Sequence, residues 1–409
     1  MIVVYTGETP PEEFTSSIFL AGPSPRKDGD PNWRTEAIAY LEETAYEGVV
    51  FAPTYRDKPT EAFDYDKQVG WERKWLNASD YIVFWIPRDL EKLPGFTTNV
   101  EFGLWLRSGK ILLGSPPGAP KMDYLNWWAE VEFIPRFETL PALLDATLEK
   151  LGVWAVRDDS LDLRTGGERE VPRSLWERAE FQSWYKSQKA VGNRLDGAEV
   201  VWNFRVGKRK ERTFLWALHV NMWVESEQRS KTNEVVIFRP DVSTIVAFCR
   251  PPKDSGKDQF LDTEIALVRE YRSPANNHLA MVVEVPGGSS VKLGMDADVV
   301  ASMELEEETG LSIEQSRFRY VNKRQIASTL CAHRAHVYSV ELTTTEMLTL
   351  KWDGGEPHGN EADSERTYVE IQTVRQILWR SESVDFSNVG MICEALFPEP
   401  SPFPISDFE

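Results

Sequence analysis

Three glutamates in the C-terminal half form a concentrated group of reactive side chains. Glu304, Glu307 and Glu308 are spaced i, i+3 and i+4, so on a helix their carboxylates share one face. Like charges this close repel one another, and a divalent cation relieves the repulsion. Ligands that are all oxygen favour Mg²⁺ or Mn²⁺, which can polarise a phosphorus centre under attack. The spacing therefore predicts a metal site on a helix over residues 298–308, with a solvated acidic face as the alternative.

The residues around this helix suit a loop–helix–loop phosphate site. Gly287 and Gly288 form a turn before it, and Gly310 stands where a left-handed cap ends a helix. The stretch resembles the Nudix box, whose second half it matches at these positions: Glu304, Leu305, Glu307, Glu308, Gly310 and Leu311. The resemblance implies metal-dependent pyrophosphate hydrolysis, with Glu304, Glu307 and Glu308 as metal ligands and Glu308 also catalytic. It further implies that Gly287 and Gly288 contact the substrate.

Two positions depart from the Nudix pattern. Met303 replaces the family's Arg, and Met295 falls where the pattern has an earlier Glu. These two family residues are understood to pair, and losing both together avoids leaving one partly buried charge alone. The metal carboxylates are retained, so both a catalytic domain and a binding module without catalysis remain open.

Residues on either side of the box extend the resemblance. The strand at 268–275 resembles the one that precedes the box in Nudix proteins of the ADP-ribose pyrophosphatase type. There Arg272 is a candidate to face a phosphate or stack on a base, or else a surface residue at a strand end. Downstream, Glu361 and Glu365 lie where such proteins often carry a further acidic residue, although acidic loops are common.

Several short strings recur in order through the first third of the chain. They lie at residues 18–23, 71–72, 78–85, 97–103 and 110–114. Together they resemble the nucleoside 2-deoxyribosyltransferase family and related nucleotide N-glycosidases. The resemblance implies cleavage of an N-glycosidic bond, because a carboxylate in this family captures the anomeric carbon as the base departs.

Glu101 corresponds to the family's nucleophile, and Glu72 to a second carboxylate on the preceding helix. We expect the helix N-terminus to keep Glu101 ionised. The alternative is structural, because Thr98 to Glu101 also has the spacing of a capping box. Two positions differ from the family: Gly95 replaces an Asp and Phe19 a Tyr. Both differences leave hydrolysis and transfer open.

The same resemblance implies further contacts. The sugar or a 5′-phosphate is expected to meet a set of small and polar residues: Gly22, Pro23, Thr97, Thr98 and Asn99. Asp123 is expected to reach the site of a neighbouring subunit, which predicts a homo-oligomer.

The N-terminal elements alternate between strands and helices. Short apolar runs predict strands at 18–21, 48–53, 81–86 and 111–113. Helical periodicity and Pro141 in a first turn predict the intervening helices, at 33–43, 66–77, 98–108 and 141–151. This alternation predicts an α/β fold with a doubly wound, flavodoxin-like parallel sheet, whose site lies at the carboxyl ends of the strands.

The amino-acid composition changes near residue 156. The charged, glycine-containing segment 156–173 is the best linker, which gives domains at 1–155 and 174–409. Ser174 to Glu177 has the spacing of a capping box and predicts a helix through about residue 189. The strands and helices beyond it predict a Nudix-like α/β/α sandwich. The tail, 398–409, is expected to be irregular.

The composition and net charge of the chain indicate which classes of partner to expect. The chain has 409 residues and a net charge of −19, so we expect neither duplex nucleic acid nor an anionic membrane as its main partner. Three cysteines without a C-x-x-C pair suit a reducing compartment. Neither a signal peptide nor an apolar run long enough to span a bilayer is evident, which predicts a soluble cytoplasmic protein.

Two enzyme-like halves predict sequential steps on one nucleotide or nucleoside. In one version the Nudix half trims a nucleotide before the N-terminal half releases the base; in the other the order is reversed. The alternative is a sensor, in which the Nudix half binds an ADP-ribose-like nucleotide without cleaving it and regulates the N-terminal glycosidase.

Overall fold

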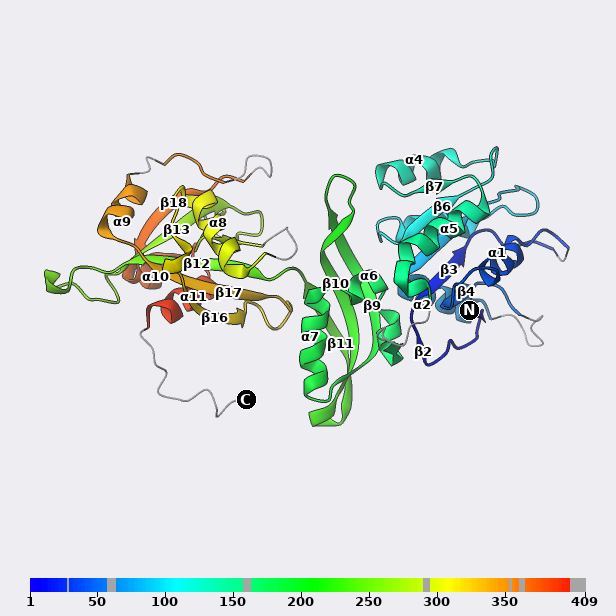
Figure 1. Cartoon of the computed structure of the whole chain (residues 1–409), viewed down its shortest axis with the longest axis horizontal. Coiled ribbons are helices and arrows are strands. Elements are labelled where there is room, and N and C mark those ends of the chain that lie inside the picture. The colour runs from blue at the N-terminus through cyan, green and yellow to red at the C-terminus, as the bar shows by residue number, and fades with distance from the viewer. Residues whose placement is uncertain are drawn as a thin grey trace. The chain divides into compact units, whose positions relative to one another are not determined.

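The computed structural model describes residues 1–27, 29–56, 64–156, 163–289, 295–352, 355–359 and 365–397. It divides the chain into two compact units (Figure 1), at 1–239 and 240–409. We call them the N-terminal unit and the C-terminal unit and describe each by itself.

A six-stranded sheet organises the N-terminal unit, in the order β1-β4-β3-β5-β6-β7 with all neighbours parallel. The strands are β1 (Ile2–Tyr5), β3 (Ser17–Ala21), β4 (Val49–Ala52), β5 (Tyr81–Trp85), β6 (Ile111–Gly114) and β7 (Arg136–Phe137). Without the edge strand β1, the order is the 2-1-3-4-5 of flavodoxin-like folds. The predicted doubly wound sheet is therefore confirmed.

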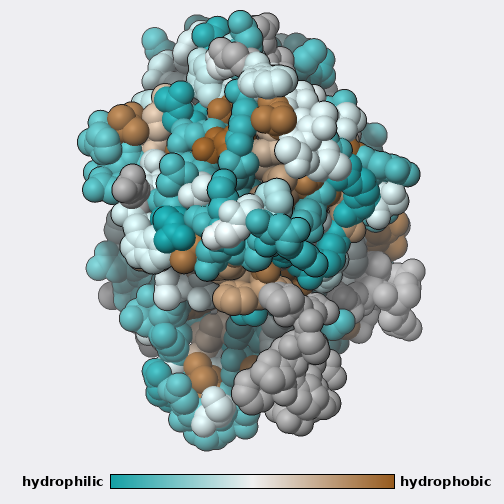
Figure 2. Space-filling model, turned by 90° about the vertical axis from the view of Figure 1, so that its left-hand side faces the viewer, coloured by the Kyte–Doolittle hydropathy of each residue, from teal (hydrophilic) through white to brown (hydrophobic). Residues whose placement is uncertain are grey.

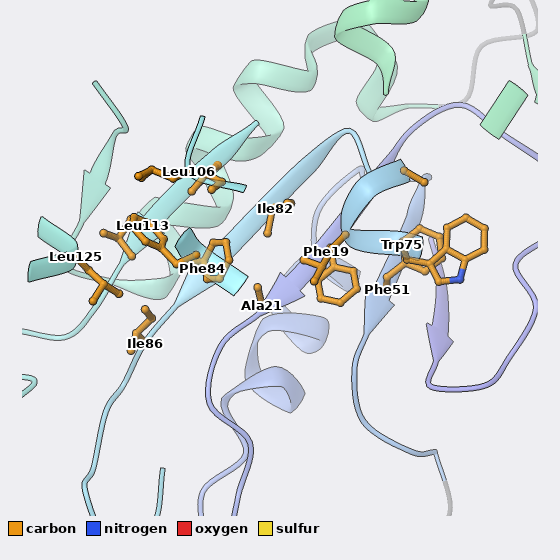
Figure 3. Packing of buried hydrophobic residues seen from close by; sticks show 14 of the residues in the cluster. Phe19, Ala21, Phe51, Trp75, Ile82, Phe84, Ile86, Leu106, Leu113 and Leu125 are labelled. Atoms are coloured by element: carbon orange, nitrogen blue, oxygen red, sulfur yellow. The ribbon is translucent and has the colours of Figure 1, made fainter. Parts of the chain in front are cut away.

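Helices cover both faces of this sheet (Figure 1). One face packs against α2 (Tyr65–Ala78), α3 (Phe96–Trp105) and α4 (Asp123–Val131), and the other against α1 (Trp33–Glu42) and α5 (Leu140–Leu151). Figure 3 shows the first of these cores, in which Phe51 and Trp75 stack with ring centroids 4.4 Å apart. Because both faces are covered, the central strands are apolar throughout, as expected for a buried parallel sheet.

The segment expected to be a linker belongs instead to the N-terminal unit. Strand β8 (Arg164–Thr165) pairs with β2 (Glu13–Phe14). The Arg164 guanidinium is fully buried and forms a two-point ion pair with Asp80, at 3.0 and 2.8 Å. The boundary between compact units therefore falls after Arg239 and not at 156–173; residues 157–162 lie outside the described residues.

A small layered subdomain completes this unit. It consists of α6 (Arg173–Trp176), α7 (Ala179–Ala190) and an antiparallel sheet in the order β11-β10-β9. These strands are β9 (Arg194–Val206), β10 (Arg212–Val224) and β11 (Arg229–Phe238). The predicted capping box at Ser174 is wrong, because the helix begins one residue earlier after Pro172 and ends at Trp176. Pro172 fixes that start.

The C-terminal unit is built on a mixed sheet, ordered β14-β13-β12-β17-β16, with β15 paired to β12 and β18 to β13. Strands β12 and β17 are parallel, and the other pairs are antiparallel. The strands are β12 (Val242–Cys249), β13 (Glu264–Tyr271), β14 (Met281–Glu284), β15 (Gly287–Gly288), β16 (Arg319–Gln325), β17 (Arg334–Glu341) and β18 (Tyr368–Thr373).

Helices lie on both faces of this second sheet. One core includes residues of α8 (Ala297–Thr309) and α9 (Thr344–Lys351), and the other residues of α10 (Val374–Arg380) and α11 (Phe386–Leu396). The layers are therefore helix, sheet and helix, while the Nudix assignment of this unit remains a prediction. The tail at 398–409 lies outside the described residues.

The surface in Figure 2 is mostly hydrophilic, with hydrophobic side chains in small separate groups. This distribution accords with the net charge of −19. Among the residues that the structure describes, no helix combines the length and apolar character needed to cross a bilayer.

Candidate active site

The strand order reverses its winding between β3 and β5, and the loops after these strands open a crevice in folds of this kind. Gly22 follows β3 directly and has φ of +154°. A Cβ added there would overlap the carbonyl oxygen of Trp85, the last residue of β5, and lie 2.7 Å from the Trp33 ring. Glycine at this position therefore lets the first loop pass close to the end of β5.

Arg34, in the first turn of α1, fixes the course of this loop. Its buried guanidinium donates from Nε to the carbonyl of Leu20 at 3.0 Å and from Nη2 to that of Gly22 at 2.6 Å. Nη1 donates to the Ser24 hydroxyl at 3.1 Å. The preceding residue, Trp33, donates from its indole Nε1 to the Pro23 carbonyl at 3.0 Å. The predicted Gly22-Pro23 loop is thus held rigidly by two adjacent side chains.

Two carboxylates come within electrostatic range of this arginine. Glu101 of α3 and Glu72 of α2 are both partly buried. Burial raises the pKa of Glu101 to about 7, the charge of Glu72 adds to the rise, and Arg34 opposes it. Burial also raises the pKa of Glu72, against Arg34 and a 2.8 Å hydrogen bond from Gln68. Both predicted carboxylates are therefore within electrostatic range of one buried cation.

The start of α3 excludes the capping-box alternative for Glu101. The helix begins at Phe96 after Gly95, which has a left-handed φ of +63° and no side-chain cap. Thr98 lies inside the helix, and Glu101 is in its second turn. The expectation that the helix N-terminus keeps Glu101 ionised is wrong, because the field of the dipole falls off within the first turn while burial raises the pKa.

Gly95 also explains one departure from the family pattern. A Cβ at this position would lie 3.2 Å from the Pro23 side chain and 3.4 Å from the Thr98 hydroxyl. The close turn brings the first loop and the first turn of α3 together, in a conformation that favours glycine over the family's Asp. Phe19, the second departure, is buried against Trp71 with ring centroids 6.2 Å apart.

The other residues that were predicted to contact the substrate do not all lie near the first loop. Thr98 is buried near Pro23, and its hydroxyl has no hydrogen-bond partner among the described residues. Thr97 is exposed in the first turn of α3. Asn99 points elsewhere, since its Oδ1 accepts a 2.5 Å hydrogen bond from Arg88. Asp123 is exposed as the first residue of α4.

In the C-terminal unit, the two predicted glycines lie against the acidic helix. The backbone N–H of Gly287 donates to Oε2 of buried Glu308 at 2.9 Å. A Cβ at Gly288 would lie 2.6 Å from the Glu304 carboxylate. Gly310 ends α8 in the left-handed conformation with φ of +70°, as predicted. The structure therefore brings Gly287, Gly288, Glu304 and Glu308 together.

Two carboxyl groups of α8, those of Glu304 and Glu308, resist ionisation. Burial and the nearby charges of Glu307 and Glu365 raise the pKa of Glu304 to about 7. Burial raises the pKa of Glu308 well above its ordinary value, although the hydrogen bond from Gly287 opposes the shift. Glu307 is exposed.

Arg272 is surrounded by three further carboxylates. Its Nη2 lies 2.7 Å from Glu270, 3.6 Å from Glu284 and 3.8 Å from Glu365. This arrangement brings predicted Glu365 beside Arg272, while Glu361 lies outside the described residues. Because Glu284 and Glu365 also raise the pKa of Glu308, the arginine and the α8 carboxylates form one charged region.

The donor types in this region suit Mg²⁺ or Mn²⁺, since they are all carboxylate oxygens. Among the described residues, however, no group of three or more acidic, histidine or cysteine side chains is arranged to hold a metal ion.

Comparison with known proteins supports the N-terminal part of this picture. Residues 15–119 match the family described as nucleoside 2-deoxyribosyltransferase like. The matched stretch contains Arg34, Glu72 and Glu101, so the N-terminal unit contains a domain similar to enzymes that act on nucleosides. No Nudix match was found over the C-terminal part. A comparison with curated proteins gives no match.

Sequence reasoning missed three residues that shape these sites. Arg34 lies in the first turn of the helix that follows the first loop, a place from which a long cation reaches the carboxyl ends of the strands. Glu270 and Glu284 lie on neighbouring strands β13 and β14. The available signal was an acidic residue, Glu270, near the end of β13 and two residues before Arg272.

Proposed function

We propose that the N-terminal unit cleaves the N-glycosidic bond of a nucleoside or nucleotide with Glu101 as the nucleophile. One observation carries the proposal: the charges of Glu72 and of buried Arg34, which holds the loop after β3, both act on partly buried Glu101, within the segment that matches the nucleoside 2-deoxyribosyltransferase-like family.

The chemistry follows from the charges. Ionised Glu101 attacks the anomeric carbon, forming a C–O ester bond as the C–N bond breaks and the base leaves with the electron pair and takes up a proton. Water then attacks the same carbon, the ester bond breaks, and Glu101 is regenerated. A second base in place of water gives transfer instead. Glu72 and Glu101 together stabilise the positive charge that develops on the sugar.

Chromatography of a nucleoside and nucleotide mixture incubated with the whole protein tests this proposal. We expect free base with the wild type and at least about a 10³-fold slower release with Glu101→Ala, since the covalent step is lost. Glu130→Gln, at an exposed site on α4, is the control and should release base normally. Unchanged release by Glu101→Ala would exclude Glu101 as nucleophile.

For the C-terminal unit we propose metal-dependent hydrolysis of a nucleoside diphosphate-linked substrate. Glu304, Glu307 and Glu308 would hold Mg²⁺ or Mn²⁺, and the metal would supply polarisation of the phosphorus centre. The clustered carboxylates with raised pKa values support this proposal, because a dication favours their ionised forms. In this proposal Arg272 binds a phosphate of the substrate.

The sensor hypothesis rests on a different observation, the presence of Met295 and Met303 where the Nudix pattern has a Glu and an Arg. In that case the C-terminal unit binds an ADP-ribose-like nucleotide and regulates base release without cleaving it. Incubation of the whole protein with ADP-ribose and Mg²⁺ or Mn²⁺ separates the two. Appearance of AMP supports hydrolysis, whereas binding without AMP supports the sensor.

A further inference from the structure

A cavity of about 710 Å³ lies between α3 and α4 of the N-terminal unit. It is lined in part by Leu106 and Leu125, which Figure 3 shows at one end of the hydrophobic core. Its volume is in the range of small-molecule sites, about 300–1,000 Å³.

This cavity is separate from the Glu101 site. Asn99 and Gly103 line it from α3, two residues before and two residues after Glu101. At about 100° per residue, both project from the face of the helix opposite Glu101. Leu104, which also lines the cavity, lies closer to the Glu101 face of α3, but no residue of the proposed nucleophilic step is among the described residues that line the cavity.

A buried cation held only by neutral groups forms one wall. Arg88 is only 6% exposed. Its Nη1 donates to the carbonyl of Lys121 at 2.9 Å and its Nη2 to Asn99 at 2.5 Å, both neutral acceptors. Among the described residues, Nε has no hydrogen-bond partner and no carboxylate pairs with Arg88. Burial lowers its pKa. A buried charge in this state is costly until an anion accompanies it.

The other charged groups around the cavity are also basic. Lys121 lines it from a left-handed backbone conformation with φ of +57°. Arg107 also lines the cavity, although it forms an ion pair with Glu132 at 3.3 Å. No acidic side chain is among the described residues that line the cavity. In a chain of net charge −19, this local excess of positive charge selects for an anion.

The remaining walls are apolar and aromatic. Phe102, Leu104, Tyr124 and Trp128 line the cavity, and the rings of Tyr124 and Trp128 meet edge to face with centroids 6.4 Å apart. Flat aromatic walls favour a planar ring in the ligand.

We propose that this cavity is a second binding site, which takes a small organic anion with a planar ring. The ring lies against Tyr124 and Trp128, and the anionic group faces Arg88 and Lys121. Aromatic carboxylates, aromatic sulfonates and ring-bearing phosphate esters share this chemistry. The proposal stands independently of the activity assigned to Glu101.

Isothermal titration of the whole protein with naphthalene-1-sulfonate tests the site, since this probe has a ring and a charge but no sugar for the Glu101 site. We expect it to bind at least about tenfold more tightly than neutral 1-naphthol, and inorganic sulfate to bind at least about tenfold more weakly than the probe. 1-Naphthyl phosphate and 1-naphthoate, which also lack a sugar, distinguish a phosphate ester from a carboxylate as the preferred anion in parallel titrations.

Two variants test whether the probe binds in the cavity. A Cβ added at Gly103 would meet open space, so Gly103→Leu fills the cavity without a clash and should weaken the probe at least about tenfold. Lys121→Asn removes a charge with a residue that tolerates left-handed backbone, and should weaken it about threefold or more. Gly390→Leu makes the same change on α11, also in open space, and should leave binding unchanged.

Each remaining outcome counts against the proposal. Absence of probe binding at millimolar concentration refutes the site. Equal binding by wild type and Gly103→Leu places the probe elsewhere. Equal affinities for the sulfonate and the neutral naphthol would show that the charges of Arg88 and Lys121 do not contribute to binding. Base release measured on the same variants keeps the two sites distinguishable, because Gly103→Leu should retain it.

Discussion

Replacement of Glu101 by glutamine should stabilise the protein as it removes activity. In the folded state the Glu101 carboxyl binds its proton more tightly than in the unfolded chain, with a pKa of about 7 against an ordinary value of 4.5. Below pH 4.5 the Glu101 carboxyl is protonated in both the folded and the unfolded state, so it does not change the free energy of unfolding. As the pH rises from there through 7, the unfolded state gains ionisation that the folded state resists, so the wild type loses stability. Glutamine has no proton to lose.

The size of this effect follows from the same values. The difference between 4.5 and about 7 corresponds to at most about 3 kcal/mol at alkaline pH, and partial exposure of the side chain reduces it to about 2 kcal/mol. For a unit of this size, about 2 kcal/mol moves the melting temperature by about 4–8 °C. Calorimetry at about pH 5 and about pH 8 should show Glu101→Gln above wild type chiefly at the higher pH.

Controls separate this effect from general changes of surface charge. Glu130→Gln, exposed on α4, should show the same melting temperature difference from wild type at both pH values. Base release by the wild type should rise with pH through about 7, because only the ionised carboxylate attacks. If Glu101→Gln gains no stability between the two pH values, or still releases base at the wild-type rate, the electrostatic account of this site fails.

Three further substitutions test other parts of the structure. Gly22→Ala forces a side chain into backbone at the end of β5, and should cost at least about 2 kcal/mol in urea unfolding and reduce base release; normal activity would show that the first loop is not held as described. Arg164→Ala leaves buried Asp80 without its counter-ion and should lower stability by about 3–5 kcal/mol, whereas a loss below about 1 kcal/mol would contradict the buried ion pair. Glu304→Gln should weaken Mn²⁺ binding at least about tenfold in calorimetric titration, while exposed Glu306→Gln on the same helix should not; equal affinities would exclude Glu304 as a ligand.

Periodicity was enough to predict the parallel sheet but not its edges. The four predicted strands and four predicted helices of the doubly wound domain are present within a few residues. The two edge strands, β1 and the two-residue β7, and helix α4, whose aromatic residues are partly exposed, were missed. All three rely on tertiary contacts more than on a local pattern. The two carboxylates were predicted from the family resemblance, and their place within electrostatic range of Arg34 depends on the fold.

The boundary between units shows a second limit of local reasoning. A charged stretch with glycines has the composition of a linker, yet Arg164 within it is buried against Asp80. Burial of an ion pair depends on a partner 84 residues away, which composition does not report. The same limit applies to Arg88, whose lack of a carboxylate partner among the described residues is visible only once the fold has placed its neighbours.

The two candidate sites use a common electrostatic device for different ligands. Each gathers partly buried carboxylates whose pKa values are raised, and each places a single arginine among them, Arg34 in one unit and Arg272 in the other. In such a site burial favours the protonated forms, and nearby positive charge stabilises the ionised forms. At Glu101 that charge develops on the sugar as the glycosidic bond breaks, so the carboxylates interact more strongly with the transition state than with the substrate. At Glu304 and Glu308 the charge must come with a bound cation, which makes metal binding release protons. A titration of Mn²⁺ in buffers of different ionisation enthalpy therefore measures proton release directly, and binding without proton release would exclude these carboxylates as the ligands.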